Sequence, residues 1–195
     1  YNVQHGVDAE YITWLTVAPE LTDITTFIPF LKRIEKNSNF KYLKIVDDAR
    51  YESEENYSFI EENNQISFIK PSNYEISKTR KYKNDISRID NMDYYSESDL
   101  FICQNGKKLI ANWIKIRKSK TGYESVKTIY ICEDCSNCNY KSQCIKGNNS
   151  KISLEKRTKK FETSKKFNRQ RKEDLERIIT DEGILLRMNR SIQAE

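Results

Sequence analysis

The chain has 195 residues, of which 37% are hydrophobic and 32% are charged, which indicates a modest core beneath a heavily charged surface. The 34 Lys and Arg residues exceed the 29 Asp and Glu residues, and the formal net charge of +5 permits a polyanionic partner without requiring one. The sequence has no apolar run near the roughly 20 residues that span a bilayer, and no signal-peptide pattern at its start. We therefore expect a cytoplasmic protein without a membrane partner, whose five cysteines are thiols or metal ligands.

The first segments predict a strand pair followed by a helix. Asn2–Val7 and Tyr11–Val17 are β-rich and predict neighbouring strands. The helix is predicted to begin at Thr25 or Thr26, with Pro29 in its first turn. Its buried face is predicted from apolar residues at helical spacing: Phe27, Phe30, Leu31 and Ile34.

A second strand–helix–strand pattern follows. Residues 41–48 predict a buried strand that ends in two acids, and Ser53 is placed to cap a helix with an acidic first turn. Gln65–Ile69 predicts another short strand. Taken together, residues 1–70 predict an α/β sheet with helices packed on it.

The middle of the chain, residues 71–150, predicts an inserted β-rich subdomain. Asn105-Gly106 is a strong two-residue turn signal between β-rich arms, and Lys127–Cys132 predicts a further strand that leads into a cysteine cluster. The last part, residues 151–195, has a helical pattern. A very basic helix is predicted over Lys156–Ile179, and Thr180 or Asp181 is placed to cap a final helix.

Asp48 is the first candidate site residue because it follows the predicted strand at 41–48. Functional side chains of α/β sheets gather just beyond the carboxyl ends of strands, and a carboxylate there is a suitable ligand for Mg²⁺. Acids after strands are common, however, and from spacing alone a capping or solvated acid is the better interpretation of Asp48. Asp47 is the weaker candidate, since neighbouring strand residues point to opposite faces.

Several segments resemble, in collinear order, DDE-type insertion-sequence transposases. VDDARYESEENY at 46–57 resembles the segment around the family's second catalytic Asp, with matches at Asp48, Ala49 and Tyr51. Five further segments match in the same order: YNVQHGVD, LTDITTFIPFLKRI, CQNGKKL, YICEDCSNCNYKSQC and EGILLRMNRSIQAE. Two positions depart from the family pattern, because Arg50 replaces a usual Gly and Ser191 replaces a frequent basic residue.

The resemblance implies an RNase H-like mixed sheet with flanking helices, interrupted by the cysteine-containing insert. Residues 1–70 would form part of the catalytic core, 71–150 the insert and 151–195 the closing helices. Three carboxylates of this family hold two Mg²⁺ or Mn²⁺ ions that cut and join DNA strands. Asp48 would be the second carboxylate and Glu195 the third, while the first lies upstream of Tyr1 in what we expect to be a longer bacterial, nucleoid-associated protein. A homodimer of that longer protein is left open.

The cysteine cluster predicts a metal site. Cys132, Cys135, Cys138 and Cys144 lie within one short loop, and Cys-x-x-Cys spacing turns two sulfurs toward one tetrahedral Zn²⁺. Cys103, beside the predicted turn, is an alternative fourth ligand. An iron–sulfur cluster and a set of free thiols remain alternatives to structural zinc.

Basic residues predict DNA contacts made through phosphates. Positive charge is concentrated at Lys78–Lys83, Lys115–Lys120 and Lys156–Lys172, although such runs are usually solvated surface. The DNA-binding candidates are Lys165, Lys166, Arg169 and Arg190. The leading hypothesis is a fragment of a transposase catalytic domain, binding transposon ends and target DNA. The alternatives are a non-catalytic, zinc-stapled DNA-binding module and a decayed remnant.

Overall fold

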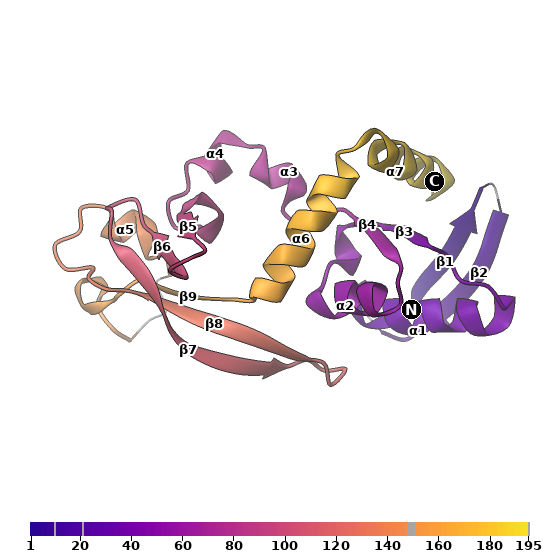
Figure 1. Ribbon diagram of the computed structural model, residues 1–195, viewed down its shortest axis with the longest axis horizontal. Coiled ribbons are helices and arrows are strands. Elements are labelled where there is room, and N and C mark those ends of the chain that lie inside the picture. The colour runs from indigo at the N-terminus through magenta and orange to yellow at the C-terminus, as the bar shows by residue number, and fades with distance from the viewer. Residues whose placement is uncertain (10, 21, 148–150, 195) are drawn as a thin grey trace. The chain divides into compact units, whose positions relative to one another are not determined.

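The computed structural model describes residues 1–9, 11–20, 22–147 and 151–194, which divide into two compact units (Figure 1). Unit 1 comprises Tyr1–Tyr74, Lys120–Tyr123 and Lys166–Glu195, and unit 2 comprises Glu75–Ser119 and Glu124–Lys165. Each unit has a hydrophobic cluster of its own, so each is described by itself.

Unit 1 begins with a hairpin. Strands β1 (Asn2–Asp8) and β2 (Tyr11–Ala18) pair antiparallel, which confirms the predicted strand pair. Gly6 lies where α1 (Asp23–Ser38) approaches the hairpin. A Cβ atom at this position would lie 3.3 Å from Ile34 Cδ1, so the glycine permits close packing of the helix on β1.

Helix α1 buries Phe27, Leu31 and Ile34 as predicted, but its predicted start was wrong. The helix begins at Asp23, whose carboxylate in the first turn interacts favourably with the helix dipole. Pro29 therefore lies inside the helix, where it cannot donate a backbone hydrogen bond to the preceding turn. The helix continues through Pro29, and it buries Phe27 and Leu31 on either side of that residue.

The second part of unit 1 is a parallel strand pair joined by a helix. Strands β3 (Lys44–Asp47) and β4 (Ile66–Ile69) pair in parallel, and α2 (Glu54–Glu62) connects them. The Ser53 hydroxyl accepts a hydrogen bond from the Asn56 backbone N–H at 3.1 Å, which confirms the predicted cap. The cluster beneath this pair consists of Phe27, Leu31, Ile45, Tyr57, Ile60 and Ile69.

Two helices complete the described part of unit 1. Helix α6 (Lys165–Ile178) and helix α7 (Asp181–Ala194) replace the predicted long basic helix and final helix. The prediction of a helix from Lys156 was wrong, because β9 (Lys160–Thr163) precedes α6 and pairs with a neighbouring strand. The predicted cap of the last helix is confirmed, since the Thr180 hydroxyl accepts from the Gly183 backbone N–H at 3.1 Å.

Unit 2 is built on an antiparallel sheet in the order β5-β6-β7-β8-β9. Its strands are β5 (Asp93–Tyr95), β6 (Leu100–Ile102), β7 (Lys108–Lys118), β8 (Glu124–Cys132) and β9. The position of the predicted turn between β6 and β7 is confirmed, with Gly106 at a φ of 71° that favours glycine, but the connection is longer than the two residues predicted, because the Cys103 N–H donates to the Lys107 carbonyl across it. The cluster on this sheet consists of Met92, Phe101, Leu109, Tyr130 and Cys132.

Short helices connect the remaining segments: α3 (Tyr74–Ser77), α4 (Arg80–Lys83) and α5 (Lys141–Cys144), with single 3₁₀ turns at Ala49–Tyr51, Ile89–Asn91 and Leu154–Lys156. Over the residues that the structure describes, the chain is thus mixed α/β, with two separate two-stranded sheets in unit 1 and one five-stranded sheet in unit 2. No helix among the described residues is long and apolar enough to cross a membrane.

Candidate functional site

Asp48 lies directly beyond the carboxyl end of β3, in unit 1. Its Oδ1 accepts a hydrogen bond from the Arg50 backbone N–H at 2.8 Å, so the side chain caps the 3₁₀ turn Ala49–Tyr51. Arg50 is not among the residues with positive φ, so the replacement of the family's Gly imposes no left-handed strain on this turn. The Asp48 side chain remains 37% exposed and is available to a ligand from solvent.

Helix α7 brings a guanidinium group to this carboxylate. Arg190 Nη2 lies 3.1 Å from Asp48 Oδ2, although the two residues are 142 positions apart in the sequence. At the other end of the two elements, Lys44 at the start of β3 forms an ion pair with Glu182 in the first turn of α7. Contacts near both ends therefore align α7 with β3 and place the last turns of α7 beside Asp48.

Asp47 differs from its neighbour in its environment. The pKa of the Asp47 carboxyl is raised to about 7, chiefly by burial among protein atoms; the nearby guanidinium of Arg190 opposes this increase, and the carboxylates of Asp48 and Asp23 add to it. A carboxyl group that is half-protonated near neutral pH carries its negative charge only part of the time, so it attracts a cation less strongly than an ionised carboxylate. Of the two adjacent acids, Asp48 is therefore the better candidate for binding a cation.

Polar side chains of the N-terminal hairpin surround the turn after β3. The Gln4 amide donates to the Thr26 hydroxyl and, at 3.1 Å, to the Tyr51 hydroxyl. Burial and the nearby carboxylates of Asp47 and Asp23 raise the pKa of Tyr51, so its hydroxyl stays protonated at neutral pH. A groove of about 570 Å³ borders this region and is lined by Tyr1, Asn2, Val3, Glu20, Thr22, Asp23, Ile24 and Arg50.

The described residues supply only part of a cation site. Asp48 offers a hard carboxylate, but one of its oxygens accepts a backbone N–H and the other faces Arg190. Throughout residues 1–9, 11–20, 22–147 and 151–194, no group of three His, Cys, Asp or Glu side chains is placed to hold a metal ion. Glu195, the predicted partner of Asp48, lies outside the described residues, directly after α7.

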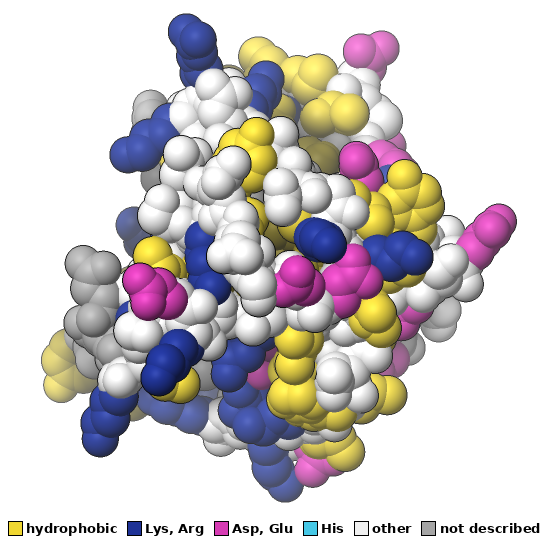
Figure 2. Space-filling view, turned by 90° about the vertical axis from the view of Figure 1, so that its left-hand side faces the viewer, with side chains coloured by type: hydrophobic (Ala, Val, Ile, Leu, Met, Phe, Trp, Pro, Cys, Tyr) yellow, Lys and Arg dark blue, Asp and Glu magenta, His cyan; other side chains and the backbone are white. Residues whose placement is uncertain are grey.

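The predicted DNA-binding residues are engaged within the protein. Lys165 Nζ lies 2.6 Å from Asp99 Oδ2 in unit 2, and Lys166 Nζ lies 3.5 Å from the Tyr123 hydroxyl in unit 1. Arg169 pairs with Glu173 at 2.9 Å. Figure 2 likewise shows Lys and Arg side chains spread over one face with Asp and Glu among them. DNA contacts by these residues remain predictions.

Helix α6 is held in unit 1 by buried ion pairs. The sequence alone did not predict these pairs. Arg171 binds both carboxylate oxygens of Glu52, at 2.6 and 2.8 Å, and the Glu52 side chain is only 2% exposed. Asp174 accepts the Ile69 backbone N–H at 2.9 Å and pairs with Arg177 at 3.2 Å. In the sequence, these four charged residues look like the solvent-exposed charged residues around them. No local pattern therefore distinguishes them.

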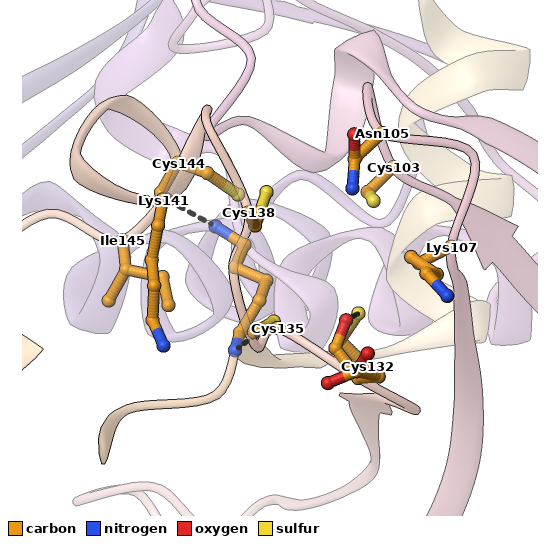
Figure 3. Close-up of a pocket in the computed structure, with 11 residues that line it drawn as sticks. Cys103, Asn105, Lys107, Cys132, Cys135, Cys138, Lys141, Cys144 and Ile145 are labelled. Atoms are coloured by element: carbon orange, nitrogen blue, oxygen red, sulfur yellow. Dashed lines mark hydrogen bonds between the residues drawn. The ribbon is translucent and has the colours of Figure 1, made fainter. Parts of the chain in front are cut away.

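The cysteine cluster is the second candidate site and lies in unit 2. All five cysteines, including Cys103, line one cavity of about 20 Å³ and are free thiols (Figure 3). As placed, their sulfur atoms surround the cavity without meeting at one point, in keeping with the lack of a three-ligand group in the described part of the chain.

Comparison with known proteins adds one finding. Residues 102–195 match the family described as the transposase DDE domain, a segment that covers just under half of the chain and extends through α7. No curated protein and no solved structure matches significantly. The family acts on DNA and uses divalent metal ions, which agrees with an exposed carboxylate beside a guanidinium group. Residues 102–195 are thus similar to the transposase DDE domain family, which supports a relationship to DDE-type transposases for this segment.

Proposed function

We propose that unit 1 is part of an RNase H-like catalytic core in which Asp48 is a metal-binding carboxylate for DNA strand cleavage and transfer. The observation that carries the proposal is the approach of α7 to Asp48, documented by the Arg190–Asp48 distance of 3.1 Å. From the family resemblance, Glu195 is proposed as a second metal-binding carboxylate of this site.

The chain's own residues would bind and orient the reactants. Asp48 supplies an exposed negative charge held in position by the Arg50 backbone N–H. Arg190 supplies a guanidinium suited to a DNA phosphate, and its pairing with Asp48 keeps both groups oriented until DNA and ions replace that contact. When bound, a pair of Mg²⁺ or Mn²⁺ ions supplies activation of the attacking oxygen and stabilisation of the leaving one.

A second candidate function is DNA binding without cleavage. Two observations favour it. The described residues contain no group of three side chains that could hold a metal ion, and Arg190 contacts one carboxylate oxygen of Asp48. In this case Lys165, Lys166, Arg169 and Arg190 would contact phosphates, and the binding constant would fall steeply with salt concentration.

The test of the metal site is Fe²⁺-dependent cleavage of the polypeptide. Fe²⁺ occupies Mg²⁺ sites of the carboxylate type, and with ascorbate and peroxide it cuts the backbone near its ligands. We expect cuts around residues 46–50 that excess Mg²⁺ suppresses and that Asp48→Asn abolishes. Asp8→Asn is the matched control, because Asp8 is an exposed acid on β1, and it should leave the cuts unchanged. The same cuts in Asp48→Asn would reject the assignment.

Nicking of supercoiled plasmid DNA in Mg²⁺ or Mn²⁺ then separates the two functions. Nicking that disappears in Asp48→Asn but persists in Asp8→Asn supports the catalytic proposal. Nicking that survives Asp48→Asn contradicts it. Plasmid binding without nicking in either metal favours the non-catalytic alternative.

A further inference from the structure

Five thiols from four structural elements line one small cavity in unit 2 (Figure 3). Cys103 comes from the turn between β6 and β7, Cys132 ends β8, Cys135 and Cys138 lie in the following loop, and Cys144 ends α5. The cavity of about 20 Å³ has room for a single ion or water molecule. Thiols are weak hydrogen-bonding groups and would hold a water molecule poorly, whereas they are strong ligands for a soft metal ion.

One of the five thiols has a different environment from the rest. Cys132 is 3% exposed, belongs to the hydrophobic cluster with Leu109 and Tyr130, and its thiol donates to the Asp134 carbonyl at 3.4 Å. The other four cysteines are half-buried and lie on a turn, a loop and a short helix. Cys103 and Cys135 also pack against this cluster, so the feature that distinguishes Cys132 from the other four thiols is its nearly complete burial.

The charges around the cavity suit an anionic centre. Lys107, Lys141 and Lys159 line it together with one acid, Asp134, which leaves a surplus of two positive charges. A Zn²⁺ ion with four thiolates carries two negative charges and would balance that surplus. The Lys159 backbone N–H also donates to Cys135 Sγ at 3.3 Å, a contact that stabilises a metal-bound thiolate.

We propose that Cys103, Cys135, Cys138 and Cys144 bind one structural Zn²⁺, and that Cys132 is a packing residue of the core instead of a ligand. Binding requires the four side chains to turn into the cavity that they now surround. The ion would tie the β6–β7 turn to the loop and helix that follow β8. This proposal is independent of the catalytic function, because unit 2 contains neither Asp48 nor Arg190.

The experiment is metal analysis of the 195-residue chain, purified under reducing conditions and dialysed against metal-free buffer. We expect about one equivalent of zinc in the parent chain. Cys103→Ala, Cys135→Ala, Cys138→Ala and Cys144→Ala should each lose most of it, and Cys132→Ala should retain it. Circular dichroism of every variant monitors folding. Cobalt exchanged for zinc should give the visible spectrum of a four-thiolate site, with weaker thiolate bands in Cys103→Ala.

Three results would overturn the proposal. The first is less than about half an equivalent of zinc in the parent chain under reducing conditions. The second is full zinc content in Cys103→Ala, which tests the ligand set even if Cys132→Ala fails to fold. The third is bound iron with visible absorption in the parent chain as purified, which would indicate an iron–sulfur cluster.

Discussion

The raised pKa of Asp47 predicts an unusual pH dependence of stability. The group titrates near pH 7 in the folded chain and near 3.8 when unfolded, so the folded chain holds this proton over a pH range in which the unfolded chain has lost it. Its contribution to the free energy of unfolding is therefore fully present below about pH 4 and is lost as pH rises through 7. Asp47→Asn removes the titration while keeping a neutral side chain of the same size.

The magnitude follows from the difference between the two pKa values. A shift from 3.8 to about 7 corresponds to on the order of 4 kcal/mol between low and high pH. Asp47 retains some contact with water, so we expect roughly half of this value. Asp47→Asn should thus unfold with nearly the parent free energy at pH 4, and should exceed the parent by about 2 kcal/mol at pH 8.

Urea unfolding at pH values from 4 to 8, in the presence of a chelator, measures this difference. Glu62→Gln is the control, because it removes an exposed acid of α2 in the same unit and should follow the parent curve. A constant difference between Asp47→Asn and the parent across the whole range would refute the assignment of the titration to Asp47. It would also remove one of the reasons for preferring Asp48 over Asp47 as the cation ligand.

Three further substitutions test the framework that supports the site. Glu52→Gln should lower the free energy of unfolding by about 3 kcal/mol by removing the buried carboxylate charge that faces Arg171, and combining it with Arg171→Met should recover part of that loss in urea unfolding. Tyr57→Phe removes a buried hydroxyl that has no hydrogen-bond partner among the described residues, so urea unfolding should show no loss and up to about 1 kcal/mol of gain. Gly183→Ala would place Cβ 2.2 Å from the Arg177 carbonyl oxygen, and its thermal midpoint should fall by several degrees; an unchanged midpoint would contradict this contact.

Local signals predicted much of the fold. Ser53 and Thr180 cap helices where the sequence placed them, and the Asn105-Gly106 turn joins β6 and β7. Each of these signals depends on residues within a few positions of one another. The prediction failed where a distant partner decides the structure. Lys160–Thr163 is a strand because it pairs with β8, while its own sequence, KFET, is short and directly follows a basic run.

The candidate sites show the same limit. Asp48 was identified through family resemblance, but its contact with Arg190 joins positions 142 residues apart and has no local signature. Cys132, one of five cysteines where a zinc ion takes four, is a similar example. Spacing grouped Cys132 with the loop cysteines, whereas the structure buries Cys132 in the unit 2 core and brings the distant Cys103 to the same cavity.

The position of Arg190 beside Asp48 is a property of the fold and does not depend on that contact alone. Helix α6 is fixed in unit 1 by Glu52–Arg171 and by the hydrogen bond from the Ile69 backbone N–H to Asp174. Close packing at Gly183 sets the turn from α6 into α7, and the ion pair of Lys44 with Glu182 aligns the start of α7 with β3. Because these contacts hold α7 without Arg190, ligands that displace the Arg190–Asp48 pair would find the carboxylate and the helix still side by side.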